Sequence, residues 1–252
     1  MLTRTLIALG LLTLSTLTLA DQVHVAVASN FTPTLRLLAA AFASQTGHQL
    51  RISSASTGKL YAQITHGAPF DLFLAADAAR PERLEQADRT VSGSRFTYAQ
   101  GRLVLWGPKI NSTLPAETLL QSNEIGHISI ANPITAPYGA AAREVLRRMS
   151  LWEGLKGRLV RGENVGQAYQ YVASGAADLG FIAYSQLVTG QHRDGYLWFI
   201  PEDYFQPIRQ QAVLLKRAEN KPAAHQFLAY LRSAAAGKII VEHGYSIQDP
   251  QN

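Results

Sequence analysis

Residues 23–47 read VHVAVASNFTPTLRLLAAAFASQTG and contain one complete strand–loop–helix unit. Its first part, Val23–Ala28, is apolar, β-branched and of strand length, which is typical of a buried parallel strand. Ser29 and Asn30 follow, and both residue types are favoured where a helix begins. Over Phe31–Gly47 apolar residues recur at helical spacing, so this segment is predicted to be a helix that ends at the glycine.

The same order of elements repeats along the chain. Leu50–Ile52 is predicted to be a short strand, followed by the hydroxyl-rich turn Ser53–Gly58 and a helix over Leu60–His66. Phe70–Ala75 is a further apolar strand and Arg83–Ala87 a further helix. Strands that alternate with helices through short loops indicate right-handed parallel βαβ units.

A second set of elements lies further along the chain. The predicted strands and helices are, in order, Arg102–Trp106, His127–Ile130, Ala140–Met149, Asn164–Ala173, Asp178–Tyr184, Gln210–Lys216, Ala223–Arg232 and Ala235–His243. We therefore expect an α/β protein with two lobes, each a mostly parallel sheet flanked by helices. Lobe 1 is expected over residues 21–100 and 211–252, and lobe 2 over residues 101–210. Two crossing segments permit a hinge, with a cleft at the carboxyl ends of the strands.

The first 20 residues, MLTRTLIALGLLTLSTLTLA, have the features of a cleavable signal peptide. Arg4 precedes the apolar run, and Thr18 and Ala20 are small residues at the positions that signal peptidase reads. A membrane anchor is the alternative, but the run of about 14 residues is shorter than the ~20 that a transmembrane helix needs. We expect an exported, periplasmic protein whose mature chain begins at Asp21.

Composition excludes several classes of function. With 47% hydrophobic and 16% charged residues in 252, the chain can bury a large core. It has no cysteine, so disulfides, thiolate metal sites and cysteine nucleophiles are excluded. The 23 Lys and Arg against 18 Asp and Glu give a mild positive charge, and the densest basic cluster has helical spacing. This cluster is Arg143, Arg147, Arg148, Lys156, Arg158 and Arg161. A solvated helix face is favoured over a nucleic-acid interface.

No catalytic or nucleotide-binding motif occurs. Thr57–Leu60 resembles part of a P-loop, but Leu60 stands where Ser or Thr must bind magnesium. The seven histidines do not pair at metal-ligand spacing. An exported enzyme that uses Asp71, Asp77 or Glu163 is an alternative, but structural roles are favoured because nothing places a nucleophile beside them.

Hydroxyls and small residues gather where predicted strands end and helices begin. Ser29–Asn30 and Ser56–Gly58 form such junctions in the first lobe, and Tyr138–Gly139 and Asn164–Gly166 in the second. The first N–H groups of a helix have no acceptor within it, and the helix dipole adds positive potential there. Several such helix ends at one cleft can bind an anion without a cationic side chain. Ordinary capping is the alternative at each single junction.

The motifs Ala28–Phe31, Ser53–Gly58 and Gly67–Phe73 resemble those of the ModA family of periplasmic molybdate-binding proteins. Further matching segments are Ala76–Asp77, Ala136–Gly139, Val165–Ala168, Gly175–Gly180 and Gly244–Tyr245. The resemblance covers essentially the whole mature chain in the expected order. It implies the two-lobed type II solute-binding fold, with no catalytic residue and no cofactor.

The resemblance also implies the ligand and its donors. A tetrahedral oxyanion, molybdate or tungstate, is expected between the lobes, with molybdenum present only within the oxyanion. Ser29 and Asn30 are expected to offer hydroxyl, side-chain amide and backbone donors, and Thr57 its hydroxyl and N–H. Tyr138 and Val165 are expected to offer backbone N–H groups. An all-donor site suits an unprotonated dianion, whereas phosphate near neutral pH often needs an acceptor.

Thr57, Ala183 and Lys59 depart from the family pattern, Thr57 because most members have Ser at that position. Many members bind the ligand through a tyrosine hydroxyl, but the aligned residue here is Ala183, and Tyr184 is expected to face the other way. The Asn30 amide is expected to take over that contact. Lys59 is expected to be exposed, and Glu163 is the one acidic residue expected near the site.

The implied partners are the permease and ATPase of a molybdate ABC importer. A monomer that binds no nucleic acid is expected. The alternatives are a receptor for another oxyanion, such as sulfate or phosphate, and an exported hydrolase that uses cleft carboxylates.

Overall fold

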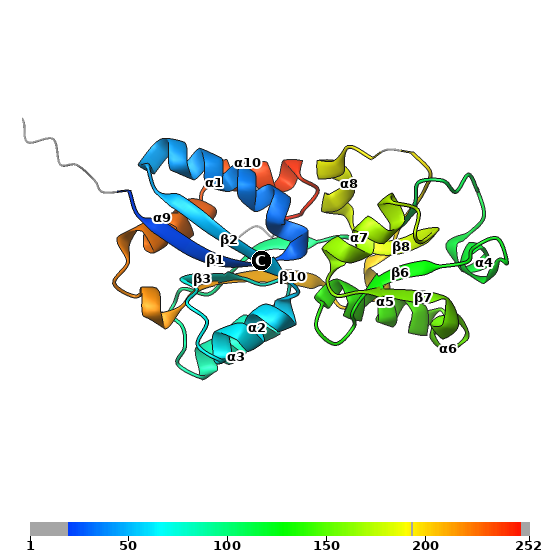
Figure 1. Cartoon of the computed structure of the whole chain (residues 1–252), viewed down its shortest axis with the longest axis horizontal. Helices are drawn as coiled ribbons and strands as arrows, with labels where there is room; N and C mark the ends of the chain where they lie inside the picture. Colours follow the sequence, from blue (N-terminus) through cyan, green and yellow to red (C-terminus); the bar gives the residue numbers. More distant parts are fainter. Residues whose placement is uncertain (1–19, 193, 248–252) are drawn as a thin grey trace, which may run out of the picture.

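The computed structural model describes residues 20–192 and 194–247, so all but the last residue of the predicted signal peptide lies outside the described part. The chain forms two five-stranded sheets that lie side by side along the long axis, each with helices on both faces (Figure 1). This arrangement confirms the expected two-lobed α/β fold. In the described part, no helix combines the length and apolar character needed to cross a bilayer.

The first sheet has the strand order β2-β1-β3-β10-β4. Its strands are β1 (Gln22–Ala28), β2 (Gln49–Ala55), β3 (Leu72–Leu74), β4 (Phe96–Gly101) and β10 (Ile208–Leu214). Its helices are α1 (Thr32–Thr46), α2 (Thr57–Thr65), α3 (Ala79–Gln86), α9 (Pro222–Leu231) and α10 (Ala234–Glu242). Val25 and Val27 of β1 pack in the core with α1, α9 and α10, whereas Ala26 packs with α2 and α3 on the other face. Strand β1 is therefore buried on both faces, as its apolar sequence predicts.

The second sheet has the order β7-β6-β8-β5-β9. Its strands are β5 (Leu103–Gly107), β6 (Ile128–Ala131), β7 (Leu159–Gly162), β8 (Leu179–Ala183) and β9 (Tyr196–Phe199). Its helices are α4 (Ala116–Gln121), α5 (Pro137–Arg148), α6 (Trp152–Leu155), α7 (Val165–Ala173) and α8 (Tyr184–Gly190). In each sheet one strand runs against the others, β10 in the first and β5 in the second. Both sheets are thus mostly parallel, as expected.

The chain crosses between the sheets twice. Arg102 alone separates β4 from β5, and residues 200–207 join β9 to β10. The strand that the chain enters after each crossing is the antiparallel strand of its sheet. Both crossings therefore end in a strand that has a neighbour on each side.

Some elements differ from the prediction. Ser53–Ala55 continue β2 rather than forming a turn, because they pair with Ala26–Ala28 of β1. Tyr184 begins α8 instead of ending a strand. Strands β4, β7 and β9 were not predicted, and all three are edge strands. Strands β4 (FTYAQG) and β7 (LVRG) have weak apolar patterns, whereas β9 (YLWF) is apolar but only four residues long.

Candidate functional site

The five residues expected to bind the ligand line one small cavity between the two sheets. Ser29, Asn30 and Thr57 reach it from the first lobe, and Tyr138 and Val165 from the second. The other lining residues are Ala28, Ser56, Ala76, Ala136 and Pro137. The cavity volume is about 10 Å³, room for about one water molecule. The lobes of this structure are therefore close together around it.

Each of these residues lies where a strand passes into a helix. Ser29–Phe31 form a 3-10 turn that leads into α1, and Thr57 is the first residue of α2. Tyr138 is the second residue of α5, and Val165 the first of α7. N–H groups in a first helical turn have no acceptor within their helix, and the dipole favours negative charge there. The described residues that line the cavity include no charged side chain, so an anion there would face the partial positive charges of these helix starts.

Two hydroxyl groups of the cavity are oriented by backbone N–H groups. Ser29 Oγ accepts a hydrogen bond from Gly166 N at 3.2 Å, a contact that joins the two lobes. Thr57 Oγ1 accepts from Ala76 N at 3.0 Å. A hydroxyl oxygen that accepts an N–H still has its own hydrogen to donate. Both side chains can therefore donate to a bound anion.

The Asn30 side chain differs from the expectation. Its Nδ2 donates to Gln210 Oε1 at 2.9 Å and to Tyr245 Oη at 3.2 Å. Tyr245 Oη in turn donates to the carbonyl oxygen of Asn30 at 2.9 Å. An amide nitrogen has two hydrogens, and both are used inside the protein. The backbone N–H of Asn30, rather than its side-chain amide, is the group that can serve the cavity.

Two tyrosine hydroxyls contact the side-chain amide of Gln210, which is the hydrogen-bond partner of Asn30. Tyr138 Oη accepts from Gln210 Nε2 at 3.4 Å, and Tyr98 Oη donates to Gln210 Oε1 at 3.1 Å. Burial raises the pKa of Tyr98 and of Tyr138 well above the usual value of about 10. Burial also raises the pKa of Tyr245. These groups are neutral donors and acceptors at ordinary pH.

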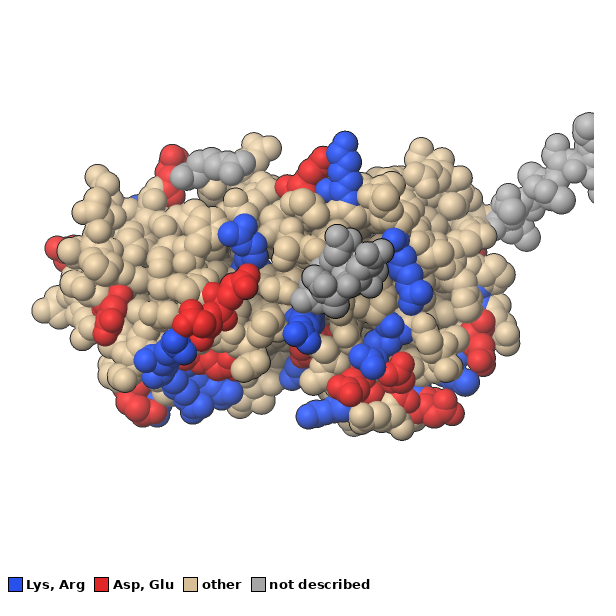
Figure 2. All heavy atoms as spheres, turned by 180° about the vertical axis from the view of Figure 1, so that it is seen from behind, with Lys and Arg blue, Asp and Glu red and all other residues tan. Residues whose placement is uncertain are grey.

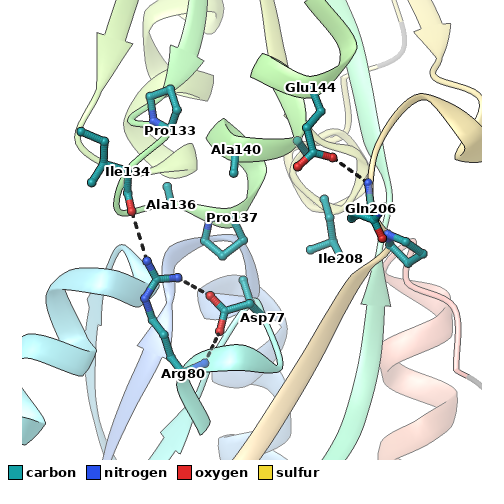
Figure 3. A pocket seen from close by; sticks show the side chains of 13 residues that line it. Asp77, Arg80, Pro133, Ile134, Ala136, Pro137, Ala140, Glu144, Gln206 and Ile208 are labelled. Carbon is teal, nitrogen blue, oxygen red and sulfur yellow. Dashed lines mark hydrogen bonds and ion pairs between the residues drawn. The ribbon is translucent and has the colours of Figure 1, made fainter. Parts of the chain in front are cut away.

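Further contacts join the lobes around the cavity. Gly58 N donates to the carbonyl oxygen of Thr135 at 2.8 Å. Arg80 forms an ion pair with Asp77 and donates to the carbonyl oxygen of Ile134 at 3.1 Å (Figure 3). Asp77, Arg80 and Ile134 line a neighbouring pocket of about 190 Å³. These polar contacts therefore lie beside the cavity.

Lys59 and Glu163 form an ion pair from opposite lobes. Their side chains are 49% and 58% exposed, so the expectation that Lys59 is solvent-accessible is confirmed, but it is not isolated. Neither residue lines the cavity. The negative charge of Glu163 is thus compensated outside the cavity instead of opposing an anion within it.

The three acids of the alternative enzyme do not form a catalytic pair. Asp71 is buried and binds Lys221 Nζ at 2.9 Å. Asp77 and Glu163 are held in the ion pairs described above. Each carboxylate has a structural partner, and no group of three or more metal-binding side chains occurs in the described part of the chain.

Ser56 was not among the predicted ligand-binding residues, although it lines the cavity. It is the N-cap residue of α2 but makes no side-chain capping bond. Its buried hydroxyl has no hydrogen-bond partner among the described residues. The run SSASTG predicts hydroxyl groups at this junction, but nothing in the sequence distinguishes Ser56 from the other hydroxyl residues of the run.

The missing tyrosine contact agrees with the expectation. Ala183 is buried at the end of β8. The ring of Tyr184 packs against Phe199, with centroids 4.9 Å apart, and lies 5.0 Å from the guanidinium carbon of Arg102. Neither Ala183 nor Tyr184 lines the cavity.

Two α/β lobes that enclose a small cavity of neutral donors define a binding protein for a small solute. The chain matches the family described as bacterial extracellular solute-binding protein over residues 23–246, and it belongs to this family. It is 46% identical over 248 residues to the molybdate-binding protein ModA of Azotobacter vinelandii, covering 98% of each chain. It is 41% identical to ModA of Rhodobacter capsulatus, covering 90% of this chain and 88% of the relative.

The solved structures agree. The periplasmic molybdate-binding protein of Azotobacter vinelandii superposes with a TM-score of 0.86 at 43% identity, covering 90% of this chain and all of that one. The sulfate-binding protein SubI of Mycobacterium tuberculosis, with a TM-score of 0.74 and 14% identity, shares the fold alone. The similar relatives are binding proteins, which confirms the expectation of a binding protein without catalytic function or cofactor.

Proposed function

We propose that this protein captures molybdate, and also tungstate, in the cavity between its lobes and delivers it to the permease and ATPase of a membrane ABC importer. The observation that carries the proposal is the cavity itself, lined from both lobes by hydroxyls and helix-start N–H groups and by no carboxylate. The names of the relatives at 46% and 41% identity support the choice of oxyanion.

The proposed donors are of two kinds. They are the hydroxyls of Ser29, Ser56 and Thr57 and the backbone N–H groups of Asn30, Thr57, Tyr138 and Val165. Ser56 is included because a buried hydroxyl without a partner costs about 1–3 kcal/mol, which a bound oxyanion would offset. A dianion that only accepts hydrogen bonds satisfies such a set of donors completely.

Binding requires the lobes to open and close. A cavity of about 10 Å³ holds about one water molecule, less than a tetrahedral oxyanion needs. The expected boundary between residues 210 and 211 falls inside β10. Because β10 pairs with β3 and β4 of the first sheet, we propose that the second hinge is the segment 200–207 instead. The moving bodies are then the first sheet with its helices and the second sheet with its helices. Only the closed form brings donors of both lobes to one ion, so the ligand shifts the population towards it.

We further propose that residues 1–20 are removed on export to the periplasm, and that the mature protein is a monomer that binds no nucleic acid. Basic and acidic side chains are interspersed on the face seen in Figure 2. In the basic cluster, Arg148 pairs with Asp203 at 2.6 Å and Lys156 with Glu153 at 2.5 Å. Such pairing supports a solvated helix face rather than a nucleic-acid interface.

Calorimetry on the mature protein tests the ligand. Molybdate and tungstate are expected to bind tightly, and sulfate and phosphate at least about tenfold more weakly, because size and protonation exclude them. Equal or tighter binding of sulfate would assign the protein to another oxyanion. Binding of none of the four would contradict the proposal altogether.

A further inference from the structure

One side chain contacts a cavity residue from each lobe. Gln210 lies in β10 and is fully buried. Its Oε1 accepts from Asn30 Nδ2 at 2.9 Å, and its Nε2 donates to Tyr138 Oη at 3.4 Å. Asn30 belongs to the first lobe, and Tyr138 begins α5 of the second. A buried polar bridge therefore runs from one half of the candidate site to the other.

Two features of β4 bring the bridge together. The pairing of β10 with β4 changes register between Gln210 and Gln211 and leaves Tyr98 of β4 as the extra residue, and such a bulge re-aims side chains of the strand that carries it. Gly101, the last residue of β4, leaves room for the bridge. A Cβ at this position would lie 2.1 Å from Tyr138 Oη and 2.8 Å from Gln210 Nε2. The bridge thus packs directly on the strand through which the chain crosses between the lobes.

The hydrogen bonds of Gln210 are shorter to residues of the first lobe than to the residue of the second. The contacts of Gln210 Oε1 with Asn30 and Tyr98, both in the first lobe, measure 2.9 and 3.1 Å. The contact between lobes, to Tyr138, is the longest at 3.4 Å. At 3.4 Å this hydrogen bond is already longer than usual, so a wider separation of the lobes would break it.

We propose that Gln210 is a positioning residue that sets the spacing between the two halves of the oxyanion cage, and with it the discrimination between large and small tetrahedral oxyanions. This inference rests on the proposed function. Tyr138 offers the ligand its backbone N–H, and its ring is held in place through Oη by Gln210. Without that tie the second half of the cage can settle at another distance. Selectivity is a difference between two affinities, so it changes when the spacing does.

Two variants break the bridge from opposite ends. Gln210→Met keeps a side chain of similar length but removes its three hydrogen bonds, to Asn30, Tyr98 and Tyr138. Tyr138→Phe removes Oη and leaves the backbone N–H of this position in place. Gln211→Ala is the matched control, because the Gln211 side chain bonds Thr97 Oγ1 at 3.1 Å and Arg95 at 3.0 Å. It does not line the cavity.

The test measures the dissociation constants for molybdate and sulfate by calorimetry in the mature wild-type protein and the three variants. The ratio of the two constants is expected to narrow about three- to tenfold in Gln210→Met and in Tyr138→Phe. Gln211→Ala is expected to keep the wild-type ratio. Melting temperatures of the ligand-free proteins accompany each measurement.

Two results would overturn the positioning role. One is an unchanged ratio in both bridge variants, and the other is a fall in melting temperature with equal weakening for both anions, which is the signature of a merely structural residue. If Gln210→Met does not fold, Tyr138→Phe decides the question alone. If the wild-type protein is selective and the variants keep its ratio of dissociation constants, only the positioning role is overturned. If the wild-type protein binds no oxyanion, the proposed function itself is contradicted.

Discussion

Gly58 and Thr135 meet across the cleft with no room between them. Gly58 N donates to the carbonyl oxygen of Thr135 at 2.8 Å, and a Cβ on Gly58 would lie 2.9 Å from that oxygen. The first turn of α2 can therefore approach the other lobe only because position 58 has no side chain. This backbone hydrogen bond can form only when the two lobes are in contact.

Gly58→Ala is expected to hold the lobes apart. The added methyl group must displace the backbone of Thr135 in the closed form, at a cost of about 1–3 kcal/mol. Molybdate affinity should fall at least about fivefold, while the ligand-free protein, free to open, should melt near the wild-type temperature. Gly154→Ala is the control, because nothing lies within 4 Å of a Cβ there. Wild-type affinity in Gly58→Ala would show that the contact does not limit closure.

Thr57→Ala is expected to weaken molybdate binding about tenfold or more, because a hydrogen bond to a charged partner contributes about 1.5–3 kcal/mol. Thr57→Ser keeps the hydroxyl that accepts from Ala76 N and should stay within about threefold of wild type. Calorimetry on both variants measures the difference. Equal affinities for the Ala and Ser variants would remove the Thr57 hydroxyl from the site.

Ser56→Ala is expected to change stability and binding in opposite directions. The substitution removes a buried hydroxyl that has no partner among the described residues and makes no capping bond. The ligand-free protein should thus be as stable as wild type or more so. Molybdate affinity should fall, because the oxyanion loses a donor. Thermal melting with and without molybdate shows both effects, and a loss of stability without loss of affinity would assign Ser56 a structural role instead.

The Lys59–Glu163 pair is expected to contribute little. Both side chains are about half exposed, and exposed pairs stabilise by about 0–1 kcal/mol. Lys59→Met should weaken binding by less than about fivefold, and the loss should shrink as salt rises. In Glu163→Gln, loss of the ion pair is opposed by removal of a negative charge, so the change should be smaller still. A large effect of Glu163→Gln that persists in high salt would place this carboxylate closer to the ligand than the structure does.

Alkaline pH is expected to destabilise the protein through its buried tyrosines. Because burial raises the pKa of Tyr98 and Tyr138 above about 10, the folded state holds these protons more tightly than the unfolded state. Their contribution is complete below about pH 10 and is lost as pH rises further. Urea unfolding of wild type and Tyr98→Phe between about pH 8 and 11 measures this. The variant should lose less stability over that range, and parallel curves would contradict the assignment.

The junctions of the site could be predicted because their signals are local. Val23–Ala28 is an apolar run that ends at two capping residues, and the structure places β1 and the turn Ser29–Phe31 there. The resemblance to a family of binding proteins then selected residues that line one cavity. Local pattern and family motifs together therefore led to residues that line this cavity.

The orientation of Asn30 could not be predicted, because it depends on distant partners. Its amide is held by Gln210 and Tyr245, which are 180 and 215 positions away in the sequence. The unpaired hydroxyl of Ser56 could not be predicted for a related reason, since it depends on what surrounds the residue in three dimensions. Strands β4 and β7 have weak apolar patterns and β9 is only four residues long, so these edge strands are recognised by their pairing rather than by propensity.

The two crossings are unequal in a way that matters mechanically. Arg102 is a single-residue link whose guanidinium carbon lies 5.0 and 4.7 Å from the ring centroids of Tyr184 and Phe199, whereas residues 200–207 form a longer strap. In the proposed closure the lobes rotate about Arg102, and residues 200–207 only limit how far they rotate. The ease with which the lobes part then depends on the torsional stiffness of this one residue between its two rings.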